Sequence, residues 1–315
     1  MNYDSIKSVM ITGANAGIGK EIARQIALKK TVDTIYLACR NAQRAMAAKQ
    51  ELEASTGRSI FRIVDVDVSD LASVRRLLAS LKTPVDALIM NAGGAGGAAP
   101  MALTNDGVSY IFAQNVLGHA ALLEGMLEAG LLGQAALFLG SEGARGVPKM
   151  GIKRPALPTS SPEEFADIAT GAAYAGKKLD IFSVYGAVKF VGVLWMANLA
   201  RRYPNVRLLS VSPGGTQGTE AANSLPGGMR FFYNNIYMPA LAPMFGLAHS
   251  LKTGAKRIVD GLVDQSLLSG HFYGAKANTL TGPLVDQSEI FSDLGNATVQ
   301  QNAAEAVNRF AKARA

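Results

Sequence analysis

The chain has 315 residues, of which 49% are hydrophobic and 17% charged, and its formal net charge is +7. This length suits one large α/β domain, and the basic residues are scattered rather than gathered into a nucleic-acid-binding patch. The single cysteine excludes an intramolecular disulfide, three dispersed histidines argue against a zinc site, and no apolar run is long enough to predict a transmembrane helix. With no signal-peptide pattern at the N-terminus, we expect a cytoplasmic protein.

Short apolar strands alternate with helices, which is the pattern of βαβ units and a parallel sheet. We therefore predict one Rossmann-type domain over residues 1–315: a doubly wound, mainly parallel sheet with helices on both faces, in a three-layer α/β/α arrangement. Strands are expected at 8–12, 34–38, 60–66, 86–90, 135–139 and 206–211. Helices are expected at 20–30, 70–81, 105–128, 181–202 and 296–315, with a further helix that ends near residue 55.

A glycine-rich turn follows the first strand and opens the first helix, as a nucleotide-binding turn must. Gly13 allows the tight turn, Gly17 lets the backbone approach a diphosphate, and Gly19 allows close packing of helix on strand. Asn15 and Ile18 belong to the same loop, so we expect them to contact the nucleotide with it.

The end of the second strand selects between the two nicotinamide dinucleotides. An acidic residue there suits the ribose hydroxyls of NAD, whereas a basic residue suits the additional phosphate of NADP. This chain has Arg40 and Asn41 at that point, and Arg40 can make forked, charge-assisted hydrogen bonds to a phosphate. We therefore predict NADP(H) as the cofactor.

Two stretches interrupt the alternation of strands and helices. Residues 144–179 are rich in proline and glycine, and we predict a loop insertion there, of a length that is usually functional or disordered. Residues 220–250 are apolar and aromatic and follow the sixth strand, which predicts a lid over a hydrophobic substrate. The same residues would suit core packing, a subunit contact or a peripheral membrane contact, and the sequence leaves these alternatives open.

Tyr185 and Lys189 are four residues apart on the helix that follows the insertion, so their side chains share one face. A cation next to a phenol favours the phenolate, and we expect it to lower the pKa of Tyr185 from its usual value of about 10. Such a tyrosine can donate or accept a proton in a reaction.

The ordered set of motifs between residue 8 and about residue 220 resembles that of the single-domain short-chain dehydrogenases/reductases. The resemblance implies a catalytic set at Asn115, Ser141, Tyr185 and Lys189. It also implies cofactor contacts at the loop Thr12-Gly13-x-x-x-Gly17-Ile18-Gly19, at the adenine-contacting pair Asp67-Val68, at the turn Asn91-Ala92-Gly93, at Tyr185 and Lys189, at the turn Pro213-Gly214 beside the nicotinamide, and at Thr216 and Thr219 beyond it.

In that family the reaction is hydride transfer between the nicotinamide and a carbonyl or alcohol. By resemblance, Tyr185 would move the proton, Lys189 would lower the pKa of Tyr185 and hold the nicotinamide ribose, and Ser141 would hydrogen-bond the carbonyl oxygen. Asn115 would hold a water that keeps the proton relay connected. The expected partner is a small, hydrophobic substrate.

Ser141 and Tyr185 lie much further apart than in many relatives. This separation is similar to the insertion in retinol dehydrogenase-like enzymes, carbonyl reductases and light-dependent protochlorophyllide reductases. Gly215 stands where the last group usually has cysteine, which argues against pigment photoreduction. A reductase of carbon–carbon double bonds and a non-catalytic NADP(H)-binding sensor stay as alternatives, and the oligomeric state is left open.

Overall fold

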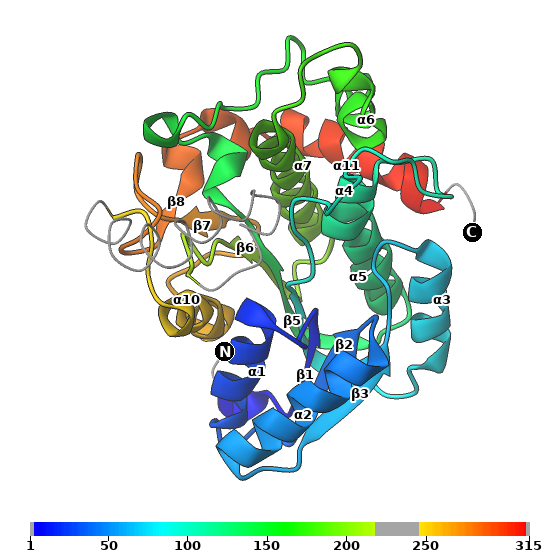
Figure 1. The fold of residues 1–315 in the computed structure, drawn as a ribbon, viewed down its shortest axis with the longest axis vertical. Coiled ribbons are helices and arrows are strands. Elements are labelled where there is room, and N and C mark those ends of the chain that lie inside the picture. The colour runs from blue at the N-terminus through cyan, green and yellow to red at the C-terminus, as the bar shows by residue number, and fades with distance from the viewer. Residues whose placement is uncertain (1–2, 218–245, 313–315) are drawn as a thin grey trace.

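The computed structural model describes residues 3–217 and 246–312, in which eight strands form one sheet in the order β3-β2-β1-β4-β5-β6-β7-β8 (Figure 1). The first seven strands are parallel, and β8 is antiparallel to β7. The strands are β1 (Ser8–Thr12), β2 (Thr34–Cys39), β3 (Phe61–Asp65), β4 (Val85–Met90), β5 (Leu132–Leu139), β6 (Arg207–Val211), β7 (Phe272–Gly274) and β8 (Val285–Asp286). The predicted mainly parallel, doubly wound sheet is confirmed. The strand order reverses between β1 and β4, which is the switch point where such sheets bind ligands.

Helices cover both faces of the sheet, which confirms the three layers (Figure 1). The helices α1, α2 and α10 pack on one face, while α3, α5 and α7 pack on the other and α11 lies against α7. Their bounds are α1 (Gly17–Ala27), α2 (Ala42–Thr56), α3 (Leu71–Ser80), α4 (Tyr110–Phe112), α5 (Gly118–Glu128), α6 (Pro162–Thr170), α7 (Ile181–Arg202), α10 (Leu251–Val263) and α11 (Ala297–Lys312).

Both faces of the central strands are buried, because helices lie on each side. In β1, Val9 and Ile11 face the layer of α1 and α10, whereas Met10 faces the layer of α5 and α7. Alternate side chains of one strand thus pack in two separate hydrophobic cores, one on each face of the sheet. A strand buried in this way needs apolar residues at every position, and this is why the strands read as short continuous apolar runs.

Several helices begin at a side-chain cap. Asn41, Asp70, Asp180 and Ser250 each accept a hydrogen bond from a backbone N–H of the first turn of α2, α3, α7 and α10, respectively. Such caps satisfy amide groups that have no partner within the helix. The cap at Asp70 lies at the predicted start of the helix at 70–81.

The insertion at 144–179 differs from the predicted loop because it contains the helix α6. Ser161 and Glu164 form a capping box at its start, Pro162 occupies its first position, and Gly171 ends it with φ 89°. Proline at the first helical position and glycine just after the last are compatible with a helix. The prediction treated them as signals of a loop, and α6 instead packs on α11.

Other elements also differ from the prediction. The expected single helix at 105–128 is divided into α4, a π-helical segment from Ala113 to Leu117, and α5. The sequence did not predict α10, β7 or β8, and the two strands are too short to show a pattern. The predicted terminal helix is confirmed as α11. Nearly all of the predicted lid lies outside the described residues, and its described end pairs at His249 with Thr216.

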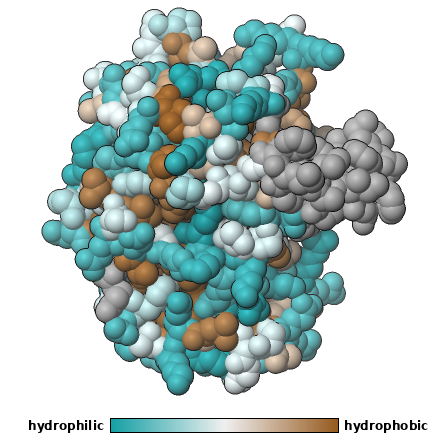
Figure 2. Space-filling view, turned by 90° about the vertical axis from the view of Figure 1, so that its left-hand side faces the viewer, coloured by the Kyte–Doolittle hydropathy of each residue, from teal (hydrophilic) through white to brown (hydrophobic). Residues whose placement is uncertain are grey.

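The helix α7 is long and apolar enough to cross a membrane by length and composition, although 72% of its most apolar window is buried inside the protein. This burial is that of a core helix between the sheet and α11. The exposed large apolar side chains of the described residues come from separate elements and include Leu28, Leu103 and Phe182. Figure 2 shows the apolar groups of one face separated by hydrophilic residues.

Candidate active site

The turn between β1 and α1 presents backbone N–H groups at the carboxyl edge of the sheet. Gly13 and Gly17 have φ values of 66° and 52°, which favour glycine. The N-cap residue of α1 is Ala16, and no side chain caps this end in the described part of the chain. The first amides of α1 therefore stay available to an anion, and the helix dipole favours a negative charge there.

Asn91 fixes this turn from the end of β4. Its Nδ2 donates to the backbone oxygens of Thr12 at 2.9 Å and Gly13 at 3.3 Å. A Cβ on Gly19 would lie 2.5 Å from the same Nδ2 atom, so only glycine fits there. Asn91 thus supports the glycine turn, and the adjoining Ala92 donates its N–H to Thr12 Oγ1 at 3.0 Å.

Arg40 follows β2 and is exposed over the neighbouring strand end. Its Nη1 donates to the hydroxyl of Tyr110 at 2.6 Å and lies 3.8 Å from the carboxylate of Asp67. The guanidinium is thereby directed across the ends of β2 and β3. Asn41 caps α2, so at least one of its side-chain atoms has a structural partner.

The pair Asp67-Val68 follows β3. One carboxylate oxygen of Asp67 accepts from the N–H and the hydroxyl of Ser69, which forms a tight turn. Val68 is buried, and a Cβ on Gly118 would lie 1.7 Å from its carbonyl oxygen. The close approach of α5 to this turn therefore depends on Gly118.

Asn115 lies in the π-helical segment before α5. Its Oδ1 accepts from Gly94 N at 3.1 Å, and its Nδ2 donates to the carbonyl oxygens of Gly94 and Ile111, both at 2.8 Å. A Cβ on Gly93 would lie 2.4 Å from Asn115 Oδ1 and 3.7 Å from Lys189 Nζ. The turn after β4 thus meets both Asn115 and Lys189. π-helical turns often occur at functional sites.

Lys189 is 3% exposed, and its Nζ donates to the carbonyl oxygen of Leu139 at the end of β5, at 3.0 Å. The same Nζ lies 4.8 Å from the ring centroid of Phe138 and 5.7 Å from that of Tyr185. Burial lowers the pKa of Lys189 from 10.5 to about 7. The amine is therefore poised between its charged and neutral forms.

The side chain of Ser141 acts on the phenol of Tyr185 and lowers its pKa. The pKa of Tyr185 is raised from 10.0 to about 12, first by burial and then by the charge of Glu142, while the hydrogen bond from Ser141 opposes both. The prediction of a lowered pKa is therefore wrong for this structure, because burial and the charge of Glu142 raise the pKa of Tyr185. Ser141 also caps the short helix after β5 and accepts from Gly143 N at 3.2 Å.

The turn after β6 follows a strand that pairs with β5, the strand that ends next to Ser141. Gly214 has φ 76°, and the carbonyl oxygen of Pro213 lies 2.7 Å from His249 Nε2. The hydroxyl of Thr216, which is buried, donates to the carbonyl oxygens of Gly214 at 3.1 Å and Pro213 at 3.3 Å. Thr219 lies outside the described residues.

Sequence reasoning missed a buried carboxylate next to Ser141. Glu142 is 2% exposed, and its oxygens accept from the hydroxyl of Ser212 and from Ala275 N, at 2.5 and 2.9 Å. Ser212 in turn accepts from Gly214 N at 3.0 Å. Glu142 thereby ties together the ends of β5, β6 and β7. Its position directly after Ser141 was the available signal, whereas the other contacts require the fold.

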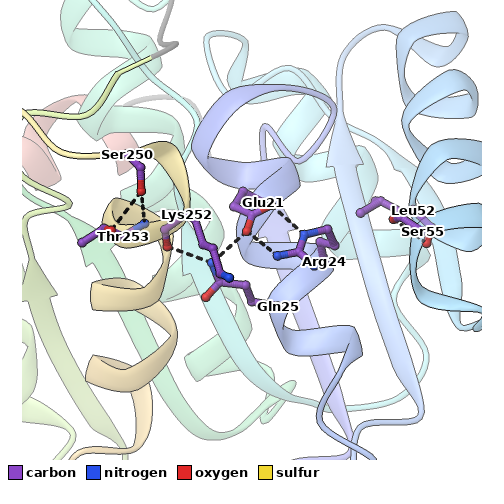
Figure 3. Close-up of polar contacts among 8 residues, drawn as sticks. All are labelled: Glu21, Arg24, Gln25, Leu52, Ser55, Ser250, Lys252 and Thr253. Atoms are coloured by element: carbon purple, nitrogen blue, oxygen red, sulfur yellow. Dashed lines mark hydrogen bonds and ion pairs between the residues drawn. The ribbon is translucent and has the colours of Figure 1, made fainter. Parts of the chain in front are cut away.

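A surface groove between α1 and α2 lies apart from these residues. Its charged side chains already pair with one another, Lys20 with Glu51 at 2.6 Å and Arg24 with Glu21 at 2.7 Å. Figure 3 shows Glu21 and Arg24 in contact on α1, with Leu52 and Ser55 across the groove on α2. This groove has no group left to bind an anion and is not the candidate site. Within residues 3–217 and 246–312, no cluster of side chains is suited to hold a metal ion.

The structure thus brings most of the predicted site residues to one edge of the sheet. Gly93 lies against both Asn115 and Lys189, the amine of Lys189 lies 5.7 Å from the ring centroid of Tyr185, and Ser141 acts on the phenol of Tyr185. A dinucleotide fits this edge, because the uncapped start of α1 suits a diphosphate and Arg40 suits an additional phosphate. Asn15, Ile18 and Asn41 border the same edge, and their side chains show no contact that identifies a cofactor role.

Comparison with known proteins shows a family match that includes the glycine turn after β1 and ends before Ser141. Residues 7–136 match the sequence model described as short chain dehydrogenase. Over 126 residues the chain is 40% identical to retinol dehydrogenase 12 of Mus musculus, an alignment that covers 39% of this chain and 38% of that protein. The match therefore spans well under half of the length of this curated relative.

Two solved structures share the fold over nearly the whole chain. An uncharacterised protein of Mycobacterium paratuberculosis is similar with a TM-score of 0.67 and 21% identity, over 99% of this chain and 97% of that one. The L-sorbose reductase of Gluconobacter frateurii, solved with NADPH and L-sorbose, is similar with a TM-score of 0.61 and 18% identity, over 90% of this chain and 100% of that one. At these identities the likeness concerns the fold alone.

Proposed function

We propose that the chain is an oxidoreductase of the short-chain dehydrogenase/reductase family that reduces the carbonyl group of a hydrophobic small molecule with NADPH. The observation that carries the proposal is that Lys189 Nζ lies 5.7 Å from the ring centroid of Tyr185, while Gly93 lies against both Lys189 and Asn115. Ser141 acts on the same phenol. These four residue types suit a proton relay beside a nicotinamide.

The cofactor supplies the hydride when it is bound. Tyr185 holds the proton that neutralises the forming alkoxide, and Ser141 donates a hydrogen bond to the same oxygen. Since the pKa of Tyr185 is raised to about 12, its hydroxyl is protonated at neutral pH. A protonated phenol can donate the proton that carbonyl reduction consumes.

The preference for NADPH is proposed from Arg40. Its guanidinium is exposed and turned across the ends of β2 and β3, where it meets Tyr110 and Asp67. A planar guanidinium suits the phosphate that distinguishes NADP from NAD. The hydrophobic substrate is proposed from the similarity to retinol dehydrogenase 12 and from the aromatic stretch at 220–250. The cytoplasmic location stays a prediction.

The test is a panel of hydrophobic aldehydes and ketones with NADPH, followed by loss of the NADPH absorbance band. Tyr185→Phe is expected to lower kcat at least about a hundredfold and to leave the Kd for NADPH within about twofold, because the phenol supplies the proton and few binding contacts. Tyr174→Phe is the matched control, since burial also raises the pKa of Tyr174 to about 12 and it lies outside the relay.

Full activity of Tyr185→Phe would refute the mechanism. Tight NADPH binding by the wild-type protein without turnover of any carbonyl compound would favour a binding protein over an enzyme. Turnover confined to substrates with a conjugated carbon–carbon double bond would point to the other class of reductase.

A further inference from the structure

Arg257 lies in α10 and is 9% exposed. Its Nε, Nη1 and Nη2 atoms are buried, and none has a hydrogen-bond partner in the described part of the chain. A guanidinium carries five N–H donors, and buried charges are normally paired. When none of the N–H donors of a buried cation has a partner, a bound ligand is one specific explanation.

The guanidinium of Arg257 lies against the Pro213–Gly214 turn. A Cβ on Gly214 would be 2.2 Å from Arg257 Nη1 and 3.1 Å from His249 Cε1. Glycine at 214 therefore does more than permit the positive φ of the turn: it leaves the space that the guanidinium occupies. Arg257 thus reaches from α10 to the edge of the sheet that carries the candidate active site.

The buried charges around this turn do not balance. The single carboxylate of Glu142 faces two buried guanidinium groups, those of Arg145 and Arg257. Arg145 donates to Gln287 and to backbone carbonyl oxygens such as that of Lys276, and the oxygens of Glu142 are taken by other donors. One positive charge is left with no hydrogen-bonded counterpart among the described residues. An anion would neutralise it.

The helix α10 packs beside α1, whose uncapped start suits a diphosphate. Gln25 of α1 donates to the carbonyl oxygen of Lys252 at 2.9 Å, and Figure 3 shows this contact between the two helices. One turn before Arg257, Gly254 lies so close to Thr216 that a Cβ would be 2.4 Å from its hydroxyl oxygen. The helix α10 is therefore held against α1 on one side and against the turn after β6 on the other.

We propose that Arg257 donates charge-assisted hydrogen bonds to an oxyanion behind the Pro213–Gly214 turn, and that this oxyanion is the diphosphate of the bound dinucleotide. The assignment rests on the proposed function. A carboxylate on the substrate would offer the same chemistry. The diphosphate is favoured because α10, which carries Arg257, packs on α1, whose uncapped start suits a diphosphate. The guanidinium fork suits two phosphate oxygens at once.

The test is calorimetric binding of three ligands to the wild-type protein and to Arg257→Gln, Arg257→Lys and Lys256→Gln. The ligands are NADP⁺, 2′-phospho-ADP-ribose, which keeps the diphosphate without the nicotinamide, and adenosine 2′,5′-bisphosphate, which has no diphosphate. Lys256 is the matched control because it is adjacent, exposed and equally charged. Circular dichroism and thermal unfolding verify the fold of each variant, and Arg257→Lys keeps the charge if Arg257→Gln does not fold.

Arg257→Gln is expected to weaken NADP⁺ and 2′-phospho-ADP-ribose by about tenfold or more, and adenosine 2′,5′-bisphosphate by less than about twofold. The affinities of Arg257→Lys should fall between those of Arg257→Gln and the wild-type protein, and those of Lys256→Gln should resemble the wild type.

Equal weakening of all three ligands in Arg257→Gln, or no weakening of any, overturns the assignment. So does unchanged NADP⁺ binding with a loss confined to carboxylate-bearing substrates. If the wild-type protein binds no dinucleotide, the proposed function fails together with this inference; if only the Arg257 variants behave as wild type, this inference alone fails.

Discussion

The hydroxyl of Thr12 lies 3.0 Å from Nε2 of His119, and the other partners of Thr12 fix the direction of this hydrogen bond. Thr12 Oγ1 accepts from the backbone N–H of Asn91 and of Ala92, so its one proton points to His119. Nε2 is then the acceptor, and Nδ1–H of His119 donates to the carbonyl oxygen of Asn115 at 3.3 Å. A neutral histidine thus joins the end of β1 to the π-helical turn at Asn115.

This arrangement predicts a pH-dependent stability. Burial, aided by the charge of Lys189, lowers the pKa of His119 from 6.5 to about 3. Below pH 6.5 His119 binds a proton in the unfolded chain but not in the folded protein. The free energy of unfolding therefore falls as the pH falls, by about 1.4 kcal/mol per pH unit. His119→Gln should reduce that slope between pH 6.5 and 4, as measured by urea unfolding. An unchanged slope in the variant would contradict the assignment.

Gly93→Ala is expected to displace Asn115, because a Cβ there would be 2.4 Å from Asn115 Oδ1. Gly94→Ala is the matched control: both glycines have φ near 150°, and a Cβ on Gly94 has nothing within 4 Å. Both variants carry backbone strain of about 1–3 kcal/mol. Only Gly93→Ala should also lower kcat, by about tenfold or more, since it disturbs the relay. Equal activity of the two variants would argue against a role of Asn115.

Lys189→Met should abolish turnover. Its free energy of unfolding should also rise less than that of the wild-type protein as the pH is raised from 7 to 9. Burial lowers the pKa of Lys189 to about 7, so between pH 7 and 10 the unfolded wild-type chain holds a proton that the folded one has released. The wild-type protein is therefore stabilised by about 1.4 kcal/mol per pH unit over this range, and the methionine variant is not. Unfolding free energies of both proteins at pH 7 and 9 check this. If the unfolding free energies of the two proteins differ by the same amount at both pH values, the pKa of Lys189 is not lowered in the folded protein.

Arg40→Gln should weaken NADPH by about tenfold and change the Kd for NADH by less than about twofold, because only NADPH carries the additional phosphate. Arg44→Gln is the control, since Arg44 lies one turn further along α2 and is exposed. Fluorescence titration with both cofactors measures the ratio of the Kd for NADH to the Kd for NADPH. Equal loss for NADPH and NADH would instead indicate that Arg40 shapes the adenine pocket through Tyr110 and Asp67.

The residues that sequence reasoning located are those whose local pattern carries the signal. The first six strands, the glycine turn after β1 and the cap at Asp70 depend on neighbours in the chain, and they lie where predicted or within three residues. The helix α6 was missed because its proline and glycine mark its ends rather than prevent it.

The residues that were missed depend on contacts between distant elements. Arg257 is one of many scattered basic residues, and nothing in its neighbourhood shows that its guanidinium is buried against Gly214. The raised pKa of Tyr185 has the same origin: spacing reveals that Lys189 is near, whereas burial and the carboxylate of Glu142 appear only in the folded chain.

The packing of α11 on α7 sets an order of events during synthesis. The helix with Tyr185 is complete when Arg202 has been added, but its outer cover begins only at Ala297. At about 5–20 residues per second, a ribosome leaves several seconds in which the apolar outer side of α7 has no cover from α11. The catalytic helix is thus among the last parts of the molecule to become enclosed, although it lies in the middle of the chain.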